Sequence, residues 1–297
     1  MYFADLLCSA GLDLKQVALC LHRPTTDFIR RELAIMVEEA PHLFEAYQST
    51  HHQSAQSTVG NRSWFASFLS DGAGEQTFIG LYRVAGHTPM SAEELDASPN
   101  MAMMKSRIRD SPFAVGRWRF DLRPDEHFSD LRRRVVVSDP GARNYMRLAE
   151  RTPLEVVEIK RRPSVSPPMP AWDVLALATS DIRQLPKEWR TTLSHWRGIY
   201  LIVDETDGAR YVGSAYGEGN LFRRWEAHVS GEVGVTKELS HRTPSTFRFS
   251  ILELLSPTAT PEEVTQKENR WMDRLHTRRF GLNAGGPPAS DASPAPR

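Results

Sequence analysis

A proline-rich segment in the middle of the chain sets the strongest limit on how it can fold. Four prolines fall within the nine residues 162–170, which read R-P-S-V-S-P-P-M-P. Proline removes backbone hydrogen-bond donors and favours extended backbone, so the segment suits a linker better than a helix or a central strand. The 297 residues are enough for two ordinary domains. We therefore predict an N-terminal domain over 1–160, a linker over 161–171 and a C-terminal domain over 172–285.

Composition narrows the class of protein. The last residues, 286–297, are mostly Pro, Ala and Ser and hold too little apolar surface to fold, so we expect a disordered tail. No apolar run approaches the 18 or so residues of a membrane span, and the first residues lack the basic and apolar regions of a signal peptide. Cys8 and Cys20 have no zinc-site spacing and suit free thiols in a reducing compartment. These features predict a cytoplasmic protein without membrane contact.

The N-terminal domain is predicted to combine helices with a sheet. A short helix is expected over 5–10 and a long one over 28–48, where apolar residues fall near helical spacing. A polar stretch over 51–62 is expected to be a loop. The strand-like runs are 16–22, 64–69, 77–84, 117–122, 134–137 and 154–159. Because strands dominate from 64 to 160, we predict a β-rich α+β domain, built as a compact sheet or a small barrel.

The C-terminal domain is predicted to hold a β-hairpin, a helix, a third strand and a second helix. An Asp207-Gly208 pair between two strand-like runs is a turn signal. Thr260, Pro261 and Glu263 form a helix start, with threonine as the N-cap, proline in the first turn and glutamate three residues after the cap. In chain order the predicted elements are 198–203, 210–213, 221–230, 247–254 and 260–277.

Arginines are concentrated in one part of a chain whose formal net charge is zero. Nine of them lie between 117 and 151 and include Arg132, Arg133 and Arg134. A local cationic stretch can be the footprint of a polyanion, and we carry these three arginines forward as candidate DNA-binding residues. Nearby carboxylates, such as Asp121 and Asp125, equally allow an ordinary solvated face.

Two helices of the C-terminal domain place ionisable side chains on otherwise apolar faces. Glu268 shares a face with Val264 and Met272, where an ionised carboxylate is costly unless it is paired or binds a metal. On the preceding helix, Arg224 and His228 lie four residues apart on the docking face, and a guanidinium there suits phosphate binding. An ion pair at Glu268 and a satisfied histidine at position 228 are the alternatives.

Aromatic residues on the hairpin complete the candidate set. Tyr200 and Tyr211 fall on its two strands, where aromatic residues are common and a core role is an adequate explanation. Neither tyrosine indicates a function by itself.

Together these residues resemble the GIY-YIG nuclease family over about 197–285. Gly198-Ile199-Tyr200 matches the first motif and Tyr211-Val212-Gly213 the second, followed by Arg224, Glu268 and a closing Gly281-Leu282-Asn283. The resemblance implies a mixed α/β nuclease domain with a small central antiparallel sheet flanked by helices. Residues 216–220 lengthen the link between the second motif and the arginine, and Lys237 stands near the place of a second histidine in some relatives. Lys237 is therefore a further candidate for contact with DNA.

The resemblance also implies roles for the matched positions. Glu268 would hold one Mg²⁺ or Mn²⁺, Tyr200 with His228 would activate water, and Arg224 would neutralise charge on the phosphate. The remaining two, Tyr211 and Asn283, would orient the phosphate or nucleophile and fix the geometry of the site.

The function expected on this basis is a metal-dependent DNA endonuclease, acting in restriction of foreign DNA, with the N-terminal domain choosing the target. A repair or mobile-element nuclease and a DNA-binding protein with a degenerate nuclease fold are the alternatives. One active site per chain would favour a homodimer for cutting a duplex. If the N-terminal domain reads a modified base, candidate aromatic residues for a cage are Trp64, Tyr82, Trp118 and Tyr145.

Overall fold

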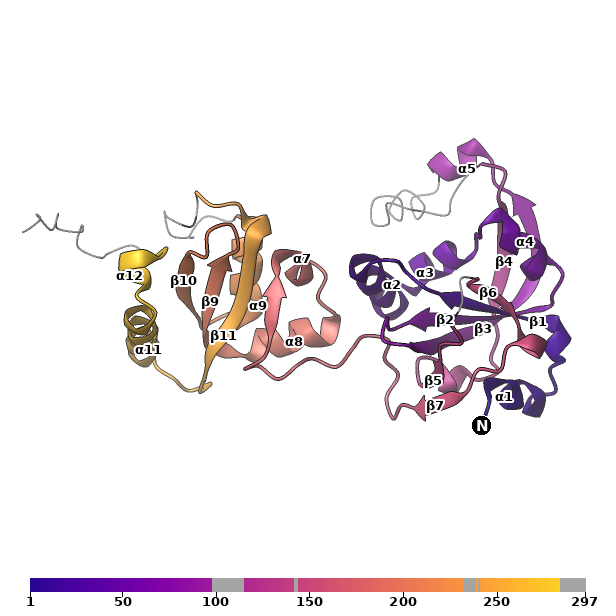
Figure 1. Cartoon of the computed structure of the whole chain (residues 1–297), viewed down its shortest axis with the longest axis horizontal. Helices are drawn as coiled ribbons and strands as arrows, with labels where there is room; N and C mark the ends of the chain where they lie inside the picture. The colour runs from indigo at the N-terminus through magenta and orange to yellow at the C-terminus, as the bar shows by residue number, and fades with distance from the viewer. Residues whose placement is uncertain (98–114, 142–143, 232–238, 240, 284–297) are drawn as a thin grey trace, which may run out of the picture. The chain divides into compact units, whose positions relative to one another are not determined.

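The protein divides into two compact units in the computed structural model, unit 1 over Met1–Pro167 and unit 2 over Pro168–Arg297 (Figure 1). The structure describes residues 1–97, 115–141, 144–231, 239 and 241–283. The division falls inside the proline-rich segment. The predicted tail 286–297 and Lys237 lie outside the described residues. No helix in the described part of the chain has the length and apolar character that a membrane crossing requires.

The helices of unit 1 differ from the sequence prediction in two places. The predicted helix over 28–48 is wrong as a single element, because the chain breaks at Ala40 (φ −143°, ψ 60°), immediately before Pro41. A proline disfavours helical backbone in the residue before it and cannot donate to the preceding turn. The predicted loop over 51–62 is also wrong: it contains a helix that buries Ala55 and Val59. The α-helices are α1 (Phe3–Ser9), α2 (Asp27–Glu39), α3 (Pro41–Gln48), α4 (Gln53–Gly60) and α5 (Ala92–Ala97).

An open mixed sheet forms the centre of unit 1. The main path runs β6-β1-β2-β3-β5-β7, and β4 pairs with the far end of the long strand β3. Among the described strands of this sheet, only β1 and β2 are parallel to each other. The described strands do not close into a barrel, because β6 and β7 are unpaired ends of the path. Their bounds are β1 (Val17–His22), β2 (Trp64–Ser70), β3 (Glu75–Pro89), β4 (Trp118–Pro124), β5 (Val135–Ser138), β6 (Met146–Leu148) and β7 (Val156–Ile159).

Helices bury the central strands of this sheet. All six residues of β1 are buried, as expected for a strand covered on both faces. Phe3 of α1 packs with Phe68 and Phe78 on one side. Val59 of α4 packs with Phe65 and other residues in a separate cluster. Short 3-10 helices connect these elements at Leu14–Gln16, Ser129–Leu131 and Ala149–Arg151.

Unit 2 contains the small antiparallel sheet with flanking helices that the sequence analysis predicts. Its strand order is β10-β9-β11-β8, and every neighbouring pair is antiparallel. The predicted last helix ends earlier than 277, because His276 adopts left-handed backbone (φ 52°) and a new short helix follows. The elements are β8 (Ala176–Ala178), α7 (Thr179–Ile182), α8 (Lys187–His195), β9 (Arg197–Asp204), β10 (Arg210–Ala215), α9 (Asn220–Ser230), a 3-10 helix (Pro244–Thr246), β11 (Phe247–Leu255), α11 (Pro261–Arg274) and α12 (Thr277–Phe280).

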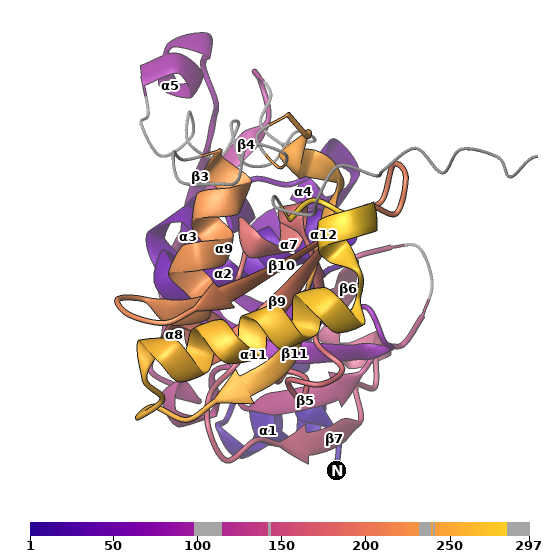
Figure 2. The same cartoon turned by 90° about the vertical axis from the view of Figure 1, so that its left-hand side faces the viewer.

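The two longest helices of unit 2 cover opposite faces of its sheet. Trp225 of α9 belongs to the core cluster that contains Tyr200 and Ile202. Val264 of α11 packs instead with Ile199, Val212 and Leu255. Figure 2 shows α11 crossing in front of β9 and β11. Since side chains alternate between the faces of a strand, β10 presents Tyr211 to one helix and Val212 to the other.

Candidate active site

Three of the predicted site residues meet at one phenol oxygen. Tyr200 Oη lies 2.7 Å from His228 Nε2, and Arg224 Nε donates to the same oxygen over 3.3 Å. Tyr200 comes from β9, whereas the other two residues come from successive turns of α9. The four-residue spacing that the sequence analysis identified puts both on the helix face turned toward the sheet. The hydroxyl is therefore held between a base and a cation.

Burial decides the protonation of this group. Tyr200 is fully buried, and burial raises its pKa well above 10, with Arg224 acting in the opposite direction. Burial, followed by the Arg224 charge, lowers the pKa of His228 to about 3. At neutral pH the phenol is therefore protonated and the imidazole is neutral. A neutral imidazole can accept a hydrogen bond from the protonated phenol, which fits the 2.7 Å contact.

Tyr211 lies next to this group on the neighbouring strand. Its ring centroid is 6.3 Å from that of Tyr200 and 5.6 Å from that of His228. Burial raises its pKa, and the Arg224 charge acts against that shift. The structure thus brings Tyr200, Tyr211, Arg224 and His228 together on the α9 face of the sheet.

Glu268 approaches from the α11 face. It is half-buried, and burial raises the pKa of its carboxyl, while hydrogen bonds from the side chain and backbone N–H of Ser214 and the charges of Arg224 and Arg278 lower it. Its charge also raises the pKa of Tyr200 and Tyr211. Within the described residues no ion pair joins Glu268 to a basic side chain. The ion-pair alternative therefore finds no support, and the carboxylate acts on the phenols across β10.

Glu268 is a single candidate ligand for a metal ion. Among the described residues, no group of three or more His, Cys, Asp or Glu side chains converges as a multidentate site. A single half-buried carboxylate with a raised pKa suits Mg²⁺, which takes few protein ligands and keeps several waters. Ser214 and Arg278 had no assigned role in the sequence analysis; Ser214 adjoins the second motif, but nothing in the sequence pointed to Arg278.

Asn283 holds the outer edge of β10. Its side-chain Oδ1 accepts from the backbone N–H of Val212 at 2.9 Å, and its Nδ2 donates to the carbonyl of the same residue at 2.7 Å. Leu282 N donates to Arg210 O at 2.7 Å. The amide thus replaces a missing neighbouring strand, and it fixes the backbone between Tyr211 and Gly213.

At the glycine of each of the three motifs, another part of the chain comes so close that a side chain would not fit. A Cβ on Gly213 would lie 2.5 Å from Tyr200 Cζ and 2.8 Å from Tyr211 Cε1. A Cβ on Gly198 would lie 2.8 Å from the carbonyl of Glu253, and one on Gly281 would lie 2.9 Å from the carbonyl of Thr277. Real Cβ atoms need more room. The glycines therefore let the two phenols and the C-terminal segment pack against the strands.

The candidate DNA-binding arginines lie in unit 1. Arg132, Arg133 and Arg134 line one cavity there. Two other arginines of the same sequence region are paired on the surface, Arg123 with Asp121 at 2.7 Å and Arg119 with Glu94 at 3.2 Å. Arg119 and Arg123 thus belong to an ordinary solvated face, whereas DNA binding by Arg132–Arg134 stays a prediction.

The four candidate aromatic residues do not form a cage. Trp118 stacks on His87 with ring centroids 3.8 Å apart. Tyr82, Trp118 and Tyr145 pack on the same core cluster, whereas Trp64 packs on a different one. Core packing therefore accounts for these rings, although Tyr82 also lines the arginine cavity.

Comparison with known proteins adds two partial likenesses. No protein-family model matches the chain, and no curated protein matches it. Among solved structures, the catalytic domain of the homing endonuclease I-TevI is 25% identical over 30% of this chain and 99% of that one, with a TM-score of 0.25. A mutant of the same domain is 24% identical over 33% of this chain and 97% of that one, also with a TM-score of 0.25. At that TM-score the likeness carries no functional argument, so the inference rests on the geometry above.

Proposed function

We propose that unit 2 is a metal-dependent endonuclease domain that hydrolyses phosphodiester bonds in DNA. The observation that carries the proposal is the Tyr200 hydroxyl, which contacts a neutral imidazole and a guanidinium and lies within the electrostatic reach of Glu268. Proton acceptor, phosphate-binding cation and metal-binding carboxylate are the groups that hydrolysis of a phosphate diester needs.

Tyr200 and His228 are proposed to act as one proton acceptor. The high pKa of Tyr200 means that it does not wait as a phenolate for the substrate. Instead, its oxygen takes a proton from the attacking water while its own proton passes to His228 Nε2 over the 2.7 Å contact. The hydroxide attacks phosphorus as the bond to the leaving oxygen breaks, and the leaving oxygen takes up a proton from solvent. Because burial and the Arg224 charge disfavour a cationic His228, the imidazole releases its proton to solvent. The proton lost by the water and the proton gained by the leaving oxygen therefore balance.

Arg224 is proposed to contact both the Tyr200 hydroxyl and the phosphate of the DNA. Its Nε donates to the Tyr200 oxygen and so stabilises negative charge there during proton transfer. A guanidinium has further N–H donors in the same plane, which match phosphate oxygens. The arginine can therefore hold the phosphate next to the phenol that activates the water.

Glu268 is proposed to hold Mg²⁺, or Mn²⁺ in its place. When bound, such an ion polarises the scissile phosphate and stabilises the leaving oxygen. Ser214 orients the carboxylate through its hydroxyl and its backbone N–H. Burial makes the ionised carboxylate costly, and a cation offsets that cost. Asn283 and the motif glycines maintain the strand from which Tyr211 and Ser214 project.

Unit 1 is proposed to choose the target, in a protein that restricts foreign DNA. Its cavity-lining arginines, Arg132, Arg133 and Arg134, have no carboxylate partner among the described residues, and unpaired cations favour a polyanion. The catalytic unit itself is small, and so most of the surface available for discrimination belongs to unit 1.

The test compares two glutamate variants of the same helix. Glu268→Gln removes the proposed metal ligand, and Glu262→Gln, which changes an exposed residue at the start of α11, is the matched control. Cleavage of unmodified and base-modified plasmid DNA is followed with Mg²⁺, and DNA binding is followed separately in EDTA. We expect Glu268→Gln to lose at least ~100-fold in cleavage rate with unchanged DNA binding, and Glu262→Gln to cut like wild type.

Two results would contradict the proposal. Equal cleavage by wild type and Glu268→Gln would remove Glu268 from the chemistry. Binding without cleavage of every DNA tested, with Mg²⁺ or Mn²⁺ present, would instead make the chain a DNA-binding protein with a degenerate catalytic unit.

A further inference from the structure

A cavity of about 650 Å³ in unit 1 combines cations with an apolar wall. We call it the arginine cavity; its cationic side consists of Arg132, Arg133, Arg134 and Arg161. Phe44, Ile79 and Tyr82 form its apolar side. Binding sites for small molecules and cofactors have volumes of about 300–1,000 Å³. The arginine cavity thus has the size for a compact ligand that carries both an anionic group and a ring.

The charges of these arginines are not neutralised by carboxylates. Arg132 donates to the backbone carbonyl of Asp125 at 2.6 Å, and Arg134 donates to the carbonyls of Lys160 and Asp130 at 2.8 and 2.9 Å. Arg132 Nε is buried and has no hydrogen-bond partner in the described part of the chain. Carbonyl groups orient a guanidinium without removing its charge. The side chains are therefore held in place as cations.

Carboxylates on the cavity wall do not cancel this field. Glu38 is fully occupied by the linker: it accepts from Val165 N at 2.8 Å, Ser166 N at 3.2 Å and Ser166 Oγ at 2.8 Å. These neutral donors leave the charge of Glu38 in place, so Glu38, Glu45 and Asp130 stand against four arginines. The local balance is positive and favours an anion.

Backbone strain fixes one of the arginines at the cavity. Arg133 has left-handed backbone (φ 59°), which is uncommon for residues other than glycine. Hydrogen bonds hold it there, from Arg133 N to Phe78 O at 2.7 Å and from Ser164 N to Arg133 O at 2.9 Å. Residues in such conformations cost of order 1–3 kcal/mol and cluster at ligand-binding sites.

A buried amide, Gln48, lies next to one residue of the apolar wall. Its side chain is completely buried, and it does not belong to the residues that line the arginine cavity. Burial raises the pKa of Tyr82, and a hydrogen bond to Gln48 lowers it. Within the apolar wall, Tyr82 is therefore the residue that supplies a polar atom.

We propose that the arginine cavity binds a single nucleotide, with its phosphate on Arg132–Arg134 and its base against the apolar wall of Phe44, Ile79 and Tyr82. This inference deepens the target selection proposed for unit 1, and it does not require unit 2 to cut. The nucleotide can come from a DNA strand, as an extruded base, or can be free in solution. Both sources share the same chemistry, a phosphate joined to a planar heterocycle.

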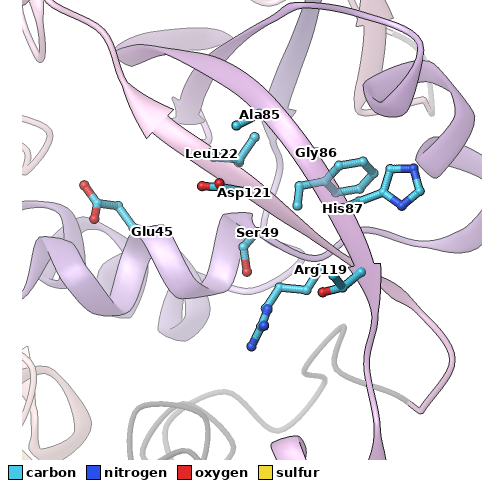
Figure 3. Close-up of a pocket in the computed structure, with 10 residues that line it drawn as sticks. Glu45, Ser49, Ala85, Gly86, His87, Arg119, Asp121 and Leu122 are labelled. Carbon is cyan, nitrogen blue, oxygen red and sulfur yellow. The ribbon is translucent and has the colours of Figure 1, made fainter.

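A neighbouring cavity shows what the arginine cavity has in addition. Figure 3 shows this second cavity, of about 590 Å³, between Glu45 and Ser49 on one side and the β3–β4 ribbon on the other. Its two β4 charges are already paired, Arg119 with Glu94 and Asp121 with Arg123. The second cavity therefore lacks the unpaired cations on which a phosphate site depends.

The experiment measures binding by the full chain in EDTA, so that cleavage plays no part. The probes are inorganic phosphate, the four deoxynucleoside monophosphates, and short matched and mismatched duplexes. Arg133→Gln removes a cavity charge, and Arg151→Gln is the matched control because Arg151 is exposed and does not line the cavity.

We expect Arg133→Gln to weaken nucleotide or mismatched-duplex binding about 10-fold and to lower the salt dependence of duplex binding by about one counterion. Arg151→Gln should change either by less than about twofold.

The ligand series separates the two sources. Binding of free monophosphates identifies a soluble nucleotide, and preference for the mismatched duplex without such binding identifies a base extruded from DNA. The proposal is overturned if phosphate binds as tightly as the nucleotides, or if Arg133→Gln and Arg151→Gln have the same affinity for every probe. Failure of plasmid cleavage with intact nucleotide binding would count only against the function proposed for unit 2.

Discussion

Replacement of Asn283 by alanine tests whether one side chain maintains the edge of the catalytic sheet. Asn283 supplies both hydrogen bonds to the outward-facing backbone of Val212, at 2.9 and 2.7 Å. Val212 is completely buried. In the alanine variant the N–H and the carbonyl of Val212 both remain buried and lose their partners.

The expected cost follows from these two groups. A buried backbone donor or acceptor without a partner costs about 1–3 kcal/mol, so Asn283→Ala should lower the free energy of unfolding of unit 2 by about 2–6 kcal/mol. Domains of ordinary size are stable by about 5–15 kcal/mol. The variant should therefore unfold at a clearly lower denaturant concentration, and the edge strand should open more often in the native state.

Two measurements check this expectation. Denaturant unfolding gives the loss of stability, and amide hydrogen exchange at Val212 reports the edge strand itself. Gln266→Ala, which removes an exposed amide from α11, is the control and should change stability by less than about 0.5 kcal/mol. An unchanged unfolding midpoint together with retained protection of the Val212 amide would refute the reasoning.

Three further predictions follow from burial and close contact. Gly213→Ala brings a Cβ to 2.5 Å from Tyr200 Cζ, about 1 Å inside the ~3.5 Å contact distance of two carbon atoms. The displaced phenol should reduce the steady-state rate of DNA cleavage by ~100-fold, while DNA binding is kept. Burial lowers the pKa of His22 to about 4, below its unfolded value of about 6.5. The stability that unit 1 gains from a neutral His22 is therefore complete above pH 6.5 and is lost as the pH falls toward 4, by up to about 3 kcal/mol. The variant His22→Gln should flatten that part of the pH–stability curve. Burial raises the pKa of the Cys20 thiol, whereas Cys8 is exposed, so a thiol reagent should label Cys8 rapidly in the native protein and Cys20 only after unfolding.

Elements with strong local signals could be predicted from the sequence. The helix start at Thr260 forms as predicted, with Thr260 Oγ1 accepting from Glu263 N and the Glu263 carboxylate accepting from Thr260 N. The two errors in unit 1 involve weaker signals of the same kind. Pro41 marked the break in the predicted long helix, and the four-residue spacing of Ala55 and Val59 marked α4 within the predicted loop.

For the candidate site, the sequence predicted the residues of each element but not which elements lie together. Sequence spacing placed Arg224 and His228 on one helix face, but only the pairing of β9 with β10 brings Tyr200 and Tyr211 beside them. The resemblance implied that Tyr200 and His228 activate water together, and the structure places the two side chains in contact. Burial raises the pKa of Tyr200, a property that the sequence does not show.

The sequence by itself determined the proline-rich division, most of the strands and helices, and the residue types of the candidate site, because these depend on contacts within a few residues along the chain. Tertiary structure alone decided which arginines are paired and how Asn283 closes the edge of β10. Those properties depend on burial and on charges from residues far apart in the sequence, whose separation in space no local pattern specifies.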